Sequence, residues 1–264
     1  MVVHEKGEKI HLELEKYGTK IVRVLPSAMQ GPDALSRIIG QVALACSLTP
    51  KLMECDTRSL LFEIYRAARL GLDISGASGQ AYLIPFGPKA TLVIGYRGMI
   101  TLACRATGVK SIRGVVVFEG EPFEYTDGLA PILRHSPTVG RQKPSDGILC
   151  AYAVATWADG ATAWKVAPGW YLAEIRDAAL AKAGGRATPW STNVEEMIAK
   201  TAVRYLCKGL DMSPDVARAI HLDDQVASGT YAPESDPEWA GFDEAPPEQS
   251  RQSEMAARMT KGNP

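Results

Sequence analysis

The sequence predicts a mixed α+β fold, in which antiparallel strand pairs in the middle of the chain are flanked by helices. Apolar residues recur at helical spacing before Gly71 and after Gly169, whereas short apolar runs alternate with turn residues between them. The 264 residues are 46% hydrophobic and 22% charged, so the chain can bury a core in one or two domains. The composition is that of an ordinary soluble globular protein.

Two helices are predicted in the first third of the chain, over residues 33–46 and 57–70. The second has clear ends, because Asp56 or Thr57 can cap its N-terminus and Gly71 can end it. One side of this helix is apolar and the other is basic. The apolar side comprises Leu60, Ile64, Ala67 and Ala68, and the basic side comprises Arg58, Phe62, Arg66 and Arg69. The simplest interpretation of the basic side is a solvated surface, and Phe62 suggests the alternative of a contact with a neighbouring subunit.

Strand pairs are predicted in the middle of the sequence. Residues 81–86 and 90–94 form the first hairpin, with Pro85 and Pro88 at its irregular end. Asp159-Gly160 favours a tight primed turn between the last two strands, because both positions tolerate positive φ. The remaining expected elements are a helix at 98–106, a hairpin of 113–118 with 122–125, a mobile loop at 127–147, strands at 148–157 and 161–166, and helices at 169–183 and 193–208.

Charge is divided unevenly along the chain, although the formal net charge is only −1. Residues 1–222 carry 26 Lys and Arg against 21 Asp and Glu, a net of +5, whereas residues 223–264 carry 3 against 9, a net of −6. A modestly basic body with an acidic, proline-rich tail fits nucleic-acid binding with a separate partner or solubility segment. A solvated tail on an ordinary domain explains the charge equally well.

The segment from residue 80 to residue 105 carries the clearest functional pattern. Two apolar runs joined by a Gly-Pro-Lys turn lead through a Gly-Tyr-Arg-Gly sequence into a short helix. Its cations are single and lie beside aromatic residues and glycines: Lys89 is in the turn, Arg97 follows Tyr96, and Arg105 lies one to two turns further on. This arrangement indicates a surface that holds a polyanion by its backbone.

A second basic pattern lies on the last predicted helix. Lys200, Arg204 and Lys208 recur every four residues, so successive members turn by only about 40° around the helix axis and form one stripe. Apolar residues lie to one side, which lets the helix pack on a core while it presents three cations along its rim. They are Val194, Ile198, Ala202, Tyr205 and Leu206. Taken alone, this pattern is explained more simply by a solvent-facing amphipathic helix.

Signatures of enzymes are missing from the sequence. It contains neither a G-x-x-x-x-G-K-[ST] phosphate loop nor a G-x-S-x-G elbow, which argues against ATP-driven activity and against a serine nucleophile of that type. The four histidines lack metal-ligand spacing, and the five cysteines form no C-x-x-C pair. An acidic cluster could hold Mg²⁺, but a solvated turn explains it more simply. This cluster comprises Glu119, Glu121, Glu124 and Asp127.

No membrane or export segment is expected. No run approaches the roughly 20 apolar residues of a membrane span, and the polar N-terminal sequence does not match a secretory signal. We therefore expect a cytoplasmic protein.

Six motifs, in a fixed order, resemble the RecT-like single-strand annealing proteins of phages and prophages. They are LPSAM at 25–29, LTPKLMECDTRSLL, AARLGLDISGASGQAYLIPFG, IGYRGMITLACRATGVKSI, VVFEGEPFEYTDG and TPWSTNVEEMIAKTAVRYLCKGL. The more distant phage Red-beta protein is similar in the strand-rich centre and around Pro189-Trp190. The similarity covers residues 20–214 and leaves unmatched a short N-terminal arm, most of the loop at 133–147, and the tail after His221.

The resemblance implies a protein that binds single-stranded DNA and anneals a complementary strand without ATP, rather than an enzyme. No cofactor is implied, and Mg²⁺ would act only as a DNA counterion. The implied partners are single-stranded DNA, the annealed duplex intermediate, further copies in a ring or helical filament, a 5′ to 3′ exonuclease and a host single-strand-binding protein in the bacterial cell. The implied fold is an α+β domain with a basic DNA groove, divided into an arm at 1–20, a DNA-binding, annealing and oligomerisation domain at 21–222, and a tail at 223–264.

Annealing requires that the protein hold phosphates and leave the base edges free. We expect one wall of the groove to contain Lys89, Arg97, Arg105, Lys110 and Arg113, and the other to contain Lys200, Arg204 and Lys208. Gln80 is expected to contact the DNA backbone, Tyr96 to stack on bases, and Tyr82 either to stack or to lie in the core. Gly95 and Gly98 are expected to allow close approach of the protein backbone to the DNA.

Two other functions stay open. One is a structural or partner-binding protein in which the acidic tail is primary, and the other is a metal-dependent nuclease that uses the acidic cluster. The tail itself is expected to be either largely disordered or small and helical, with a short helix at 250–259 that recruits the host single-strand-binding protein or the partner nuclease.

Overall fold

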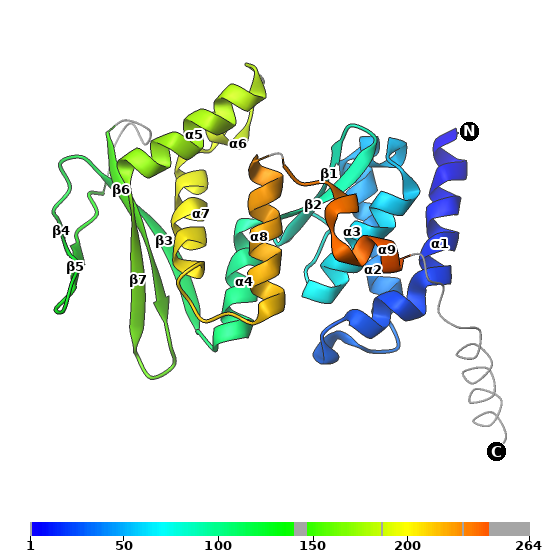
Figure 1. Ribbon diagram of the computed structural model, residues 1–264, viewed down its shortest axis with the longest axis horizontal. Helices are drawn as coiled ribbons and strands as arrows, with labels where there is room; N and C mark the ends of the chain where they lie inside the picture. Colours follow the sequence, from blue (N-terminus) through cyan, green and yellow to red (C-terminus); the bar gives the residue numbers. More distant parts are fainter. Residues whose placement is uncertain (1, 140–146, 186, 229, 243–264) are drawn as a thin grey trace. The chain divides into compact units, whose positions relative to one another are not determined.

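The computed structural model describes residues 2–139, 147–185, 187–228 and 230–242, and it confirms the α+β class (Figure 1). The chain divides into two compact units. Unit 1 comprises Met1–Arg97 together with Leu222–Pro264, and unit 2 comprises Gly98–His221. This division differs from the expected arm, body and tail, because the end of the chain joins its beginning in one unit.

Three helices form the base of unit 1. They are α1 (Val2–Val24), α2 (Ala34–Leu48) and α3 (Thr57–Leu70), with the short 3-10 turns η1 (Ser27–Met29) and η2 (Pro50–Glu54) between them. Helix α1 contains the expected N-terminal arm and buries Ile10, Leu14 and Ile21 against α2 and α3. Their spacing of four and seven residues places these side chains on one helical face.

The ends of α3 are those predicted from its sequence. The Asp56 carboxylate accepts a hydrogen bond from the Ser59 N–H at 2.9 Å, and Gly71 ends the helix with a left-handed φ of 60°. Leu60, Ile64 and Ala67 are buried as expected. Phe62 and Arg66, on the side expected to be solvated, are buried as well.

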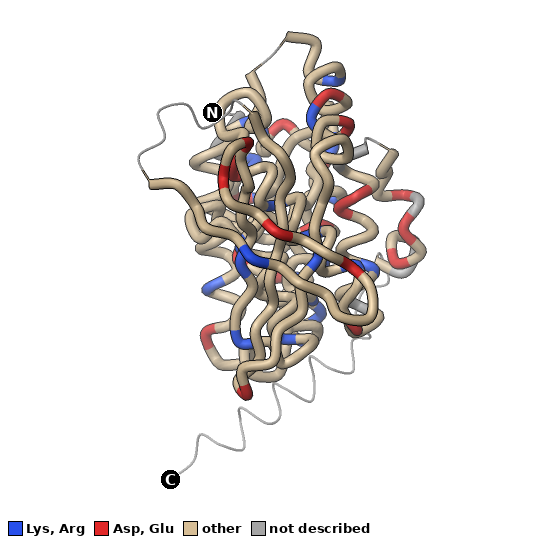
Figure 2. The backbone as a smooth tube through the Cα atoms, turned by 90° about the vertical axis from the view of Figure 1, so that its left-hand side faces the viewer, with Lys and Arg blue, Asp and Glu red and all other residues tan. Residues whose placement is uncertain are grey.

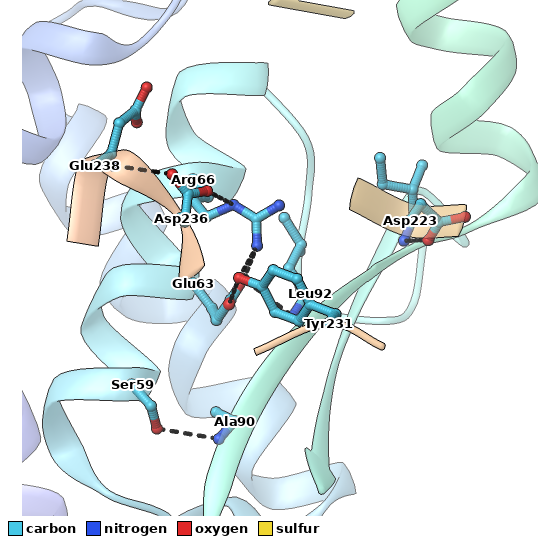
Figure 3. A network of polar contacts seen from close by, with 10 residues as sticks. Ser59, Glu63, Arg66, Ala90, Leu92, Asp223, Tyr231, Asp236 and Glu238 are labelled. Carbon is cyan, nitrogen blue, oxygen red and sulfur yellow. Dashed lines mark hydrogen bonds and ion pairs between the residues drawn. The ribbon is translucent and has the colours of Figure 1, made fainter. Parts of the chain in front are cut away.

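A two-stranded antiparallel sheet, β1 (Ala81–Phe86) with β2 (Lys89–Ile94), confirms the first predicted hairpin. The N–H groups of β2 that point away from β1 meet side-chain acceptors instead of a third strand (Figure 3). Ala90 donates to Ser59 Oγ at 3.1 Å, Leu92 to Glu63 Oε2 at 3.1 Å and Ile94 to Asp223 Oδ1 at 2.9 Å. The buried edge of the sheet is therefore satisfied by α3 and by the chain after residue 222.

The C-terminal part of unit 1 distinguishes the two forms expected for the tail. Helix α8 (Pro214–Ser228) enters the unit, and η3 (Pro233–Ser235) and α9 (Pro237–Phe242) follow within it. Asp223, Asp236 and Phe242 are buried, so as far as residue 242 the tail has the small helical form and not the disordered one. The helix predicted at 250–259 lies outside the described residues.

A three-stranded antiparallel sheet forms the centre of unit 2, with β3 (Ser111–Phe118), β6 (Ile148–Thr156) and β7 (Thr162–Pro168) in the order β3-β6-β7. Helix α7 (Val194–Cys207) packs across one face of all three strands (Figure 1). Gly114 lies under this helix, because a Cβ atom there would stand 2.6 Å from the Ala199 carbonyl oxygen. The other helices of the unit are α5 (Gly169–Ala183), α6 (Pro189–Thr192) and most of α4 (Tyr96–Thr107).

Strand pairing in unit 2 differs from the predicted hairpins. The segment expected to pair with β3 is β4 (Phe123–Thr126), but β4 pairs with β5 (Ile132–His135), which lies inside the predicted loop. Strand β3 pairs with β6 instead. The β4–β5 hairpin packs on the sheet face opposite α7, where Phe123 and Leu133 contact a core of Val117, Cys150 and Tyr152.

The turn between β6 and β7 is at the predicted place but has a different geometry. Gly160 has a φ of 88°, whereas no described residue other than glycine has a positive φ, which excludes a turn with positive φ at both Asp159 and Gly160. Trp157 and Ala161 close a three-residue loop through a hydrogen bond of 2.9 Å. The Asp159 carboxylate accepts from the Ala161 N–H at 2.9 Å and holds this loop.

Gly114→Ala should destabilise the protein by about 1–3 kcal/mol, because the added methyl group meets backbone that cannot rotate away. Gly40→Ala in α2 is the matched control, since nothing lies within 4 Å of its Cβ position. There the change should stabilise by about 0.5–1 kcal/mol through helix propensity. Urea unfolding measures both, and equal effects at the two positions would contradict the packing of α7 on β3.

Candidate nucleic-acid interface

The predicted DNA-binding residues fall into both units. Unit 1 holds Gln80, Lys89, Tyr96 and Arg97, and unit 2 holds Arg105, Lys110, Arg113, Lys200, Arg204 and Lys208. Lys and Arg are interspersed with Asp and Glu along the traced chain and do not form one continuous run (Figure 2). Each unit therefore has its own group of candidate cations.

Closely packed glycines position Arg97 in unit 1. A Cβ atom at Gly95 would stand 2.2 Å from the Gly79 carbonyl oxygen, so the loop before β1 lies directly against the end of β2. The exposed Arg97 side chain passes over Gly79, with its Cδ atom 3.5 Å from the Cβ position of that glycine. Gly95 thus allows close approach within the protein's own backbone, and its expected approach to DNA stays a prediction.

Gln80 and Tyr82 also shape this loop. The Gln80 Oε1 atom accepts a hydrogen bond from the Asp73 N–H at 3.1 Å, and its carbonyl oxygen accepts from the Gly95 N–H at 2.8 Å. The Tyr82 ring lies 3.5 Å from the Cβ position of Gly76, and the side chain is still 40% exposed. Gln80 therefore organises the loop, and Tyr82 packs on the glycines while it keeps part of its ring at the surface.

Helix α7 presents its basic stripe as the sequence predicts. Its apolar side packs on the sheet, with Ile198, Ala202 and Leu206 buried. Lys200 and Arg204 are half-buried, and Lys208 is exposed at the C-terminal end of the helix. The three cations lie beside the packed face and not on it.

Arg105 and Lys208 occupy neighbouring helix ends. Each follows a cysteine, and Cys104 lies close enough to Cys207 to act on its ionisation: burial raises the pKa of Cys207 to about 12, and Cys104 adds to that rise. Both cations are exposed. The end of α4 therefore places a further exposed cation in unit 2.

Arg113 lies on the other face of the unit 2 sheet. Its neighbour Gly114 faces α7, and side chains alternate along β3, so Arg113 points to the opposite face. Burial raises the pKa of Tyr152, which is on that face, and Arg113 works against this rise. Arg113 therefore does not stand opposite Lys200, Arg204 and Lys208 across a groove within unit 2.

Lys110 is exposed just before β3, where its N–H donates to the Thr156 carbonyl oxygen at 2.8 Å.

Two carboxylates of the acidic cluster considered for Mg²⁺, Glu121 and Glu124, contact other side chains of the same chain. The Glu121 side chain is buried and its Oε2 lies 3.2 Å from His135 Nε2, while His135 Nδ1 lies 3.2 Å from the Tyr152 hydroxyl. Glu124 pairs with Arg134 at 3.1 Å on the hairpin surface. Within the described ranges, no group of three or more His, Cys, Asp or Glu side chains is arranged to hold a metal ion. The cluster is neither a solvated turn throughout nor a set of converging ligands.

The basic face of α3 is covered by residues 231–242, called here the C-terminal segment. Arg66 Nη1 donates to Glu63 at 2.7 Å, and the Tyr231 hydroxyl donates to the other oxygen of Glu63 at 2.7 Å (Figure 3). Arg66 also lies 3.8 Å from Asp236. Burial raises the pKa of Glu63, and Arg66 opposes that rise. The expected solvated or intersubunit face is thus an intramolecular contact.

Aromatic side chains anchor the same segment. The Arg58 guanidinium lies 4.3 Å from the centre of the Trp239 ring, which packs edge-on against Phe62 at 5.0 Å. Phe242 stacks on Tyr17 at 5.4 Å and contacts Phe62 at 5.5 Å. Sequence reasoning missed this contact because acidic residues and prolines suggested disorder. The available signal was the alternation of carboxylates with Tyr, Trp and Phe, which complements the arginines and Phe62 of α3.

A family model described as the RecT family matches residues 36–237, a range that includes all ten predicted DNA-binding residues. The chain belongs to the RecT family. It is 39% identical over 209 residues to Protein RecT of Escherichia coli (strain K12), covering 76% of each chain. It is also 39% identical over 70 residues to Uncharacterized protein YqaK of Bacillus subtilis (strain 168), covering 26% of this chain and 25% of that one.

Membership of the RecT family supports a role in DNA recombination and annealing, and it confirms the resemblance seen in the six motifs. The family match ends at residue 237, inside the C-terminal segment. Tyr231 and Asp236 therefore lie within the region shared with the RecT family, whereas Trp239 and Phe242 lie beyond it. Among the helices of the described residues, none combines the length and apolar character needed to cross a membrane.

Phe242→Ala should destabilise the protein by about 3–5 kcal/mol, because this ring is 2% exposed and packs on three aromatic side chains. Phe86→Ala is the matched control, since Phe86 is 54% exposed and should change stability by no more than about 0.5 kcal/mol. Thermal or urea unfolding compares the two variants. Equal stability of the two variants would show that the C-terminal segment is not packed on α3.

Proposed function

We propose that this RecT-family protein binds single-stranded DNA and anneals complementary strands without ATP, as an oligomer that tracks the DNA backbone. The observation that carries the proposal is the family match across both units, which includes every cation chosen from the sequence. Single-stranded DNA of any sequence is held best through its phosphates, because the base edges must stay free to test an incoming strand.

The placement of the cations supports phosphate contacts from several separate positions. Arg97 lies exposed at the first turn of α4, where helix N-terminal N–H groups also favour phosphate. The α7 stripe and Arg105 supply a second set of cations in unit 2. Lys110, just before β3, and Arg113, on β3, lie apart from the α7 stripe. Tyr96, half-buried in the same turn as Arg97, is proposed to stack on bases. Gln80 orders the loop beside Arg97 through its hydrogen bonds with Asp73 and Gly95, and a contact of Gln80 with the DNA backbone remains part of the proposal.

The remaining parts of the proposal concern partners and conditions. The protein uses no cofactor, performs no covalent chemistry, and needs Mg²⁺ only as a DNA counterion. It works in the bacterial cytoplasm as a ring or helical filament, beside a 5′ to 3′ exonuclease and a host single-strand-binding protein. A function carried mainly by the acidic tail is less well supported, because residues 231–242 of that tail contact the chain's own α3.

Annealing is tested by mixing the protein with one labelled strand and then its complement, without nucleotide and with EDTA present. We expect retention of the single strand, faster duplex formation than the strands achieve alone, and rings or filaments in electron micrographs. A protein that leaves the single strand free and the annealing rate unchanged would overturn the proposal. DNA cleavage on addition of Mg²⁺ would favour the nuclease alternative.

Arg97→Ala and Lys208→Ala should each weaken binding to a labelled single strand. The slope of log K against log salt should become shallower by about 0.7 for each phosphate that the variant no longer neutralises. Arg23→Ala is the matched control, because this exposed arginine on α1 lies outside the family match and outside the predicted site. Fluorescence anisotropy over a salt series measures all three, and slopes equal to that of the unaltered protein would remove both residues from the site.

A further inference from the structure

The ammonium group of Lys89 is in direct contact with an acidic side chain. This lysine opens β2 and is predicted from the sequence to contact DNA, but Glu234 of η3 forms an ion pair and hydrogen bond with it. The two side chains are 38% and 46% exposed. Because the pair lies at the surface, a phosphate from solution can reach it.

Buried contacts on either side hold Glu234 in place. On one side the Tyr231 hydroxyl donates to Glu63, and on the other Asp236 is buried beside Arg66. Further along, Trp239 stacks under Arg58, and its carbonyl oxygen accepts a hydrogen bond from that arginine at 3.2 Å. Glu234 is therefore presented to Lys89 by a fixed backbone, which keeps the local concentration of its carboxylate high.

The carboxylate stays charged under ordinary conditions. The hydrogen bond from Lys89 lowers the pKa of Glu234, so the group remains ionised throughout the neutral range. Exposed ion pairs of this kind are weak, and salt screens them. Such a contact is strong enough to compete with one phosphate and weak enough for a phosphate to replace it.

We propose that Glu234 is a built-in competitor for Lys89, so that a DNA phosphate engages this lysine only by displacing the carboxylate. The inference rests on the proposed function, since it concerns regulation of the same DNA-binding surface. It gives the C-terminal segment a role in setting affinity beyond its role in packing. A strand held in this way leaves Lys89 easily, because the carboxylate returns as the phosphate departs.

The test is the affinity of the full chain for a fluorescent oligothymidylate over a salt series. Glu234→Gln should bind about two- to fivefold more tightly at low salt, with a slope steeper by about 0.7, because Lys89 becomes available to one more phosphate. Glu238→Gln is the matched control: it removes the same charge from the same segment, but its carboxylate pairs with Arg69 and not with a predicted DNA-binding residue. It should leave the slope unchanged.

A double variant decides whether the effect passes through Lys89. Adding Glu234→Gln to Lys89→Gln should give no increase in affinity over Lys89→Gln alone. An increase of the same size in both backgrounds would overturn the proposal, as would an unchanged slope for Glu234→Gln in a protein that otherwise binds the strand. If the unaltered chain fails to bind the strand at any salt, the proposed function itself fails. Thermal unfolding of each variant confirms that the segment remains packed.

Discussion

The buried carboxylate of Glu63 joins the parts of unit 1 that are far apart in the sequence. It accepts hydrogen bonds from Arg66 on its own helix, from the Leu92 N–H of β2, and from the hydroxyl of Tyr231. An isolated carboxylate at this depth would be costly, and it is tolerated because every partner is present. Removing any one of α3, β2 or the C-terminal segment leaves the others with an unsatisfied buried group. The three therefore form one cooperative unit.

This constraint explains why the acidic end of the chain packs against the basic face of α3. Arg66 and Arg69 of α3 pair with Asp236 and Glu238, while the aromatic residues around Phe242 supply the apolar burial. Arg66 is consequently buried within the fold, whereas Arg69 keeps 34% of its side chain exposed in its pair with Glu238. Lys89, a predicted DNA-binding residue that pairs with Glu234 of this segment, stands at the edge of the network.

Sequence reasoning succeeds where the determinants are local. The ends of α3 follow from Asp56 and Gly71, and the stripe on α7 follows from its four-residue spacing.

Sequence reasoning fails where the residues that make a contact are distant in the sequence. A local hairpin is predicted for the strand after β3, but β3 pairs with β6, because its alternating apolar face needs the larger core around Cys150. The C-terminal segment is predicted to be disordered from its own composition. Its partner helix α3 is distant in the sequence, as the 169 residues between Arg69 and Glu238 show. The candidate cations can be chosen from type and spacing, but not the face of the sheet on which Arg113 lies.

The distribution of charge bears on how such a protein would hold DNA. Positively and negatively charged residues are interspersed along the backbone (Figure 2), and the body carries only a small positive excess, so a single copy would offer few phosphate contacts and bind weakly. Affinity for a long strand then depends on repetition of these contacts along the backbone by neighbouring copies. Weak contacts at each copy have a physical advantage in annealing, because a mismatched strand can leave before the next copy adds its contacts. A carboxylate held against one of the cations acts in the same direction, since it lowers the affinity of each copy without removing the cation from the surface.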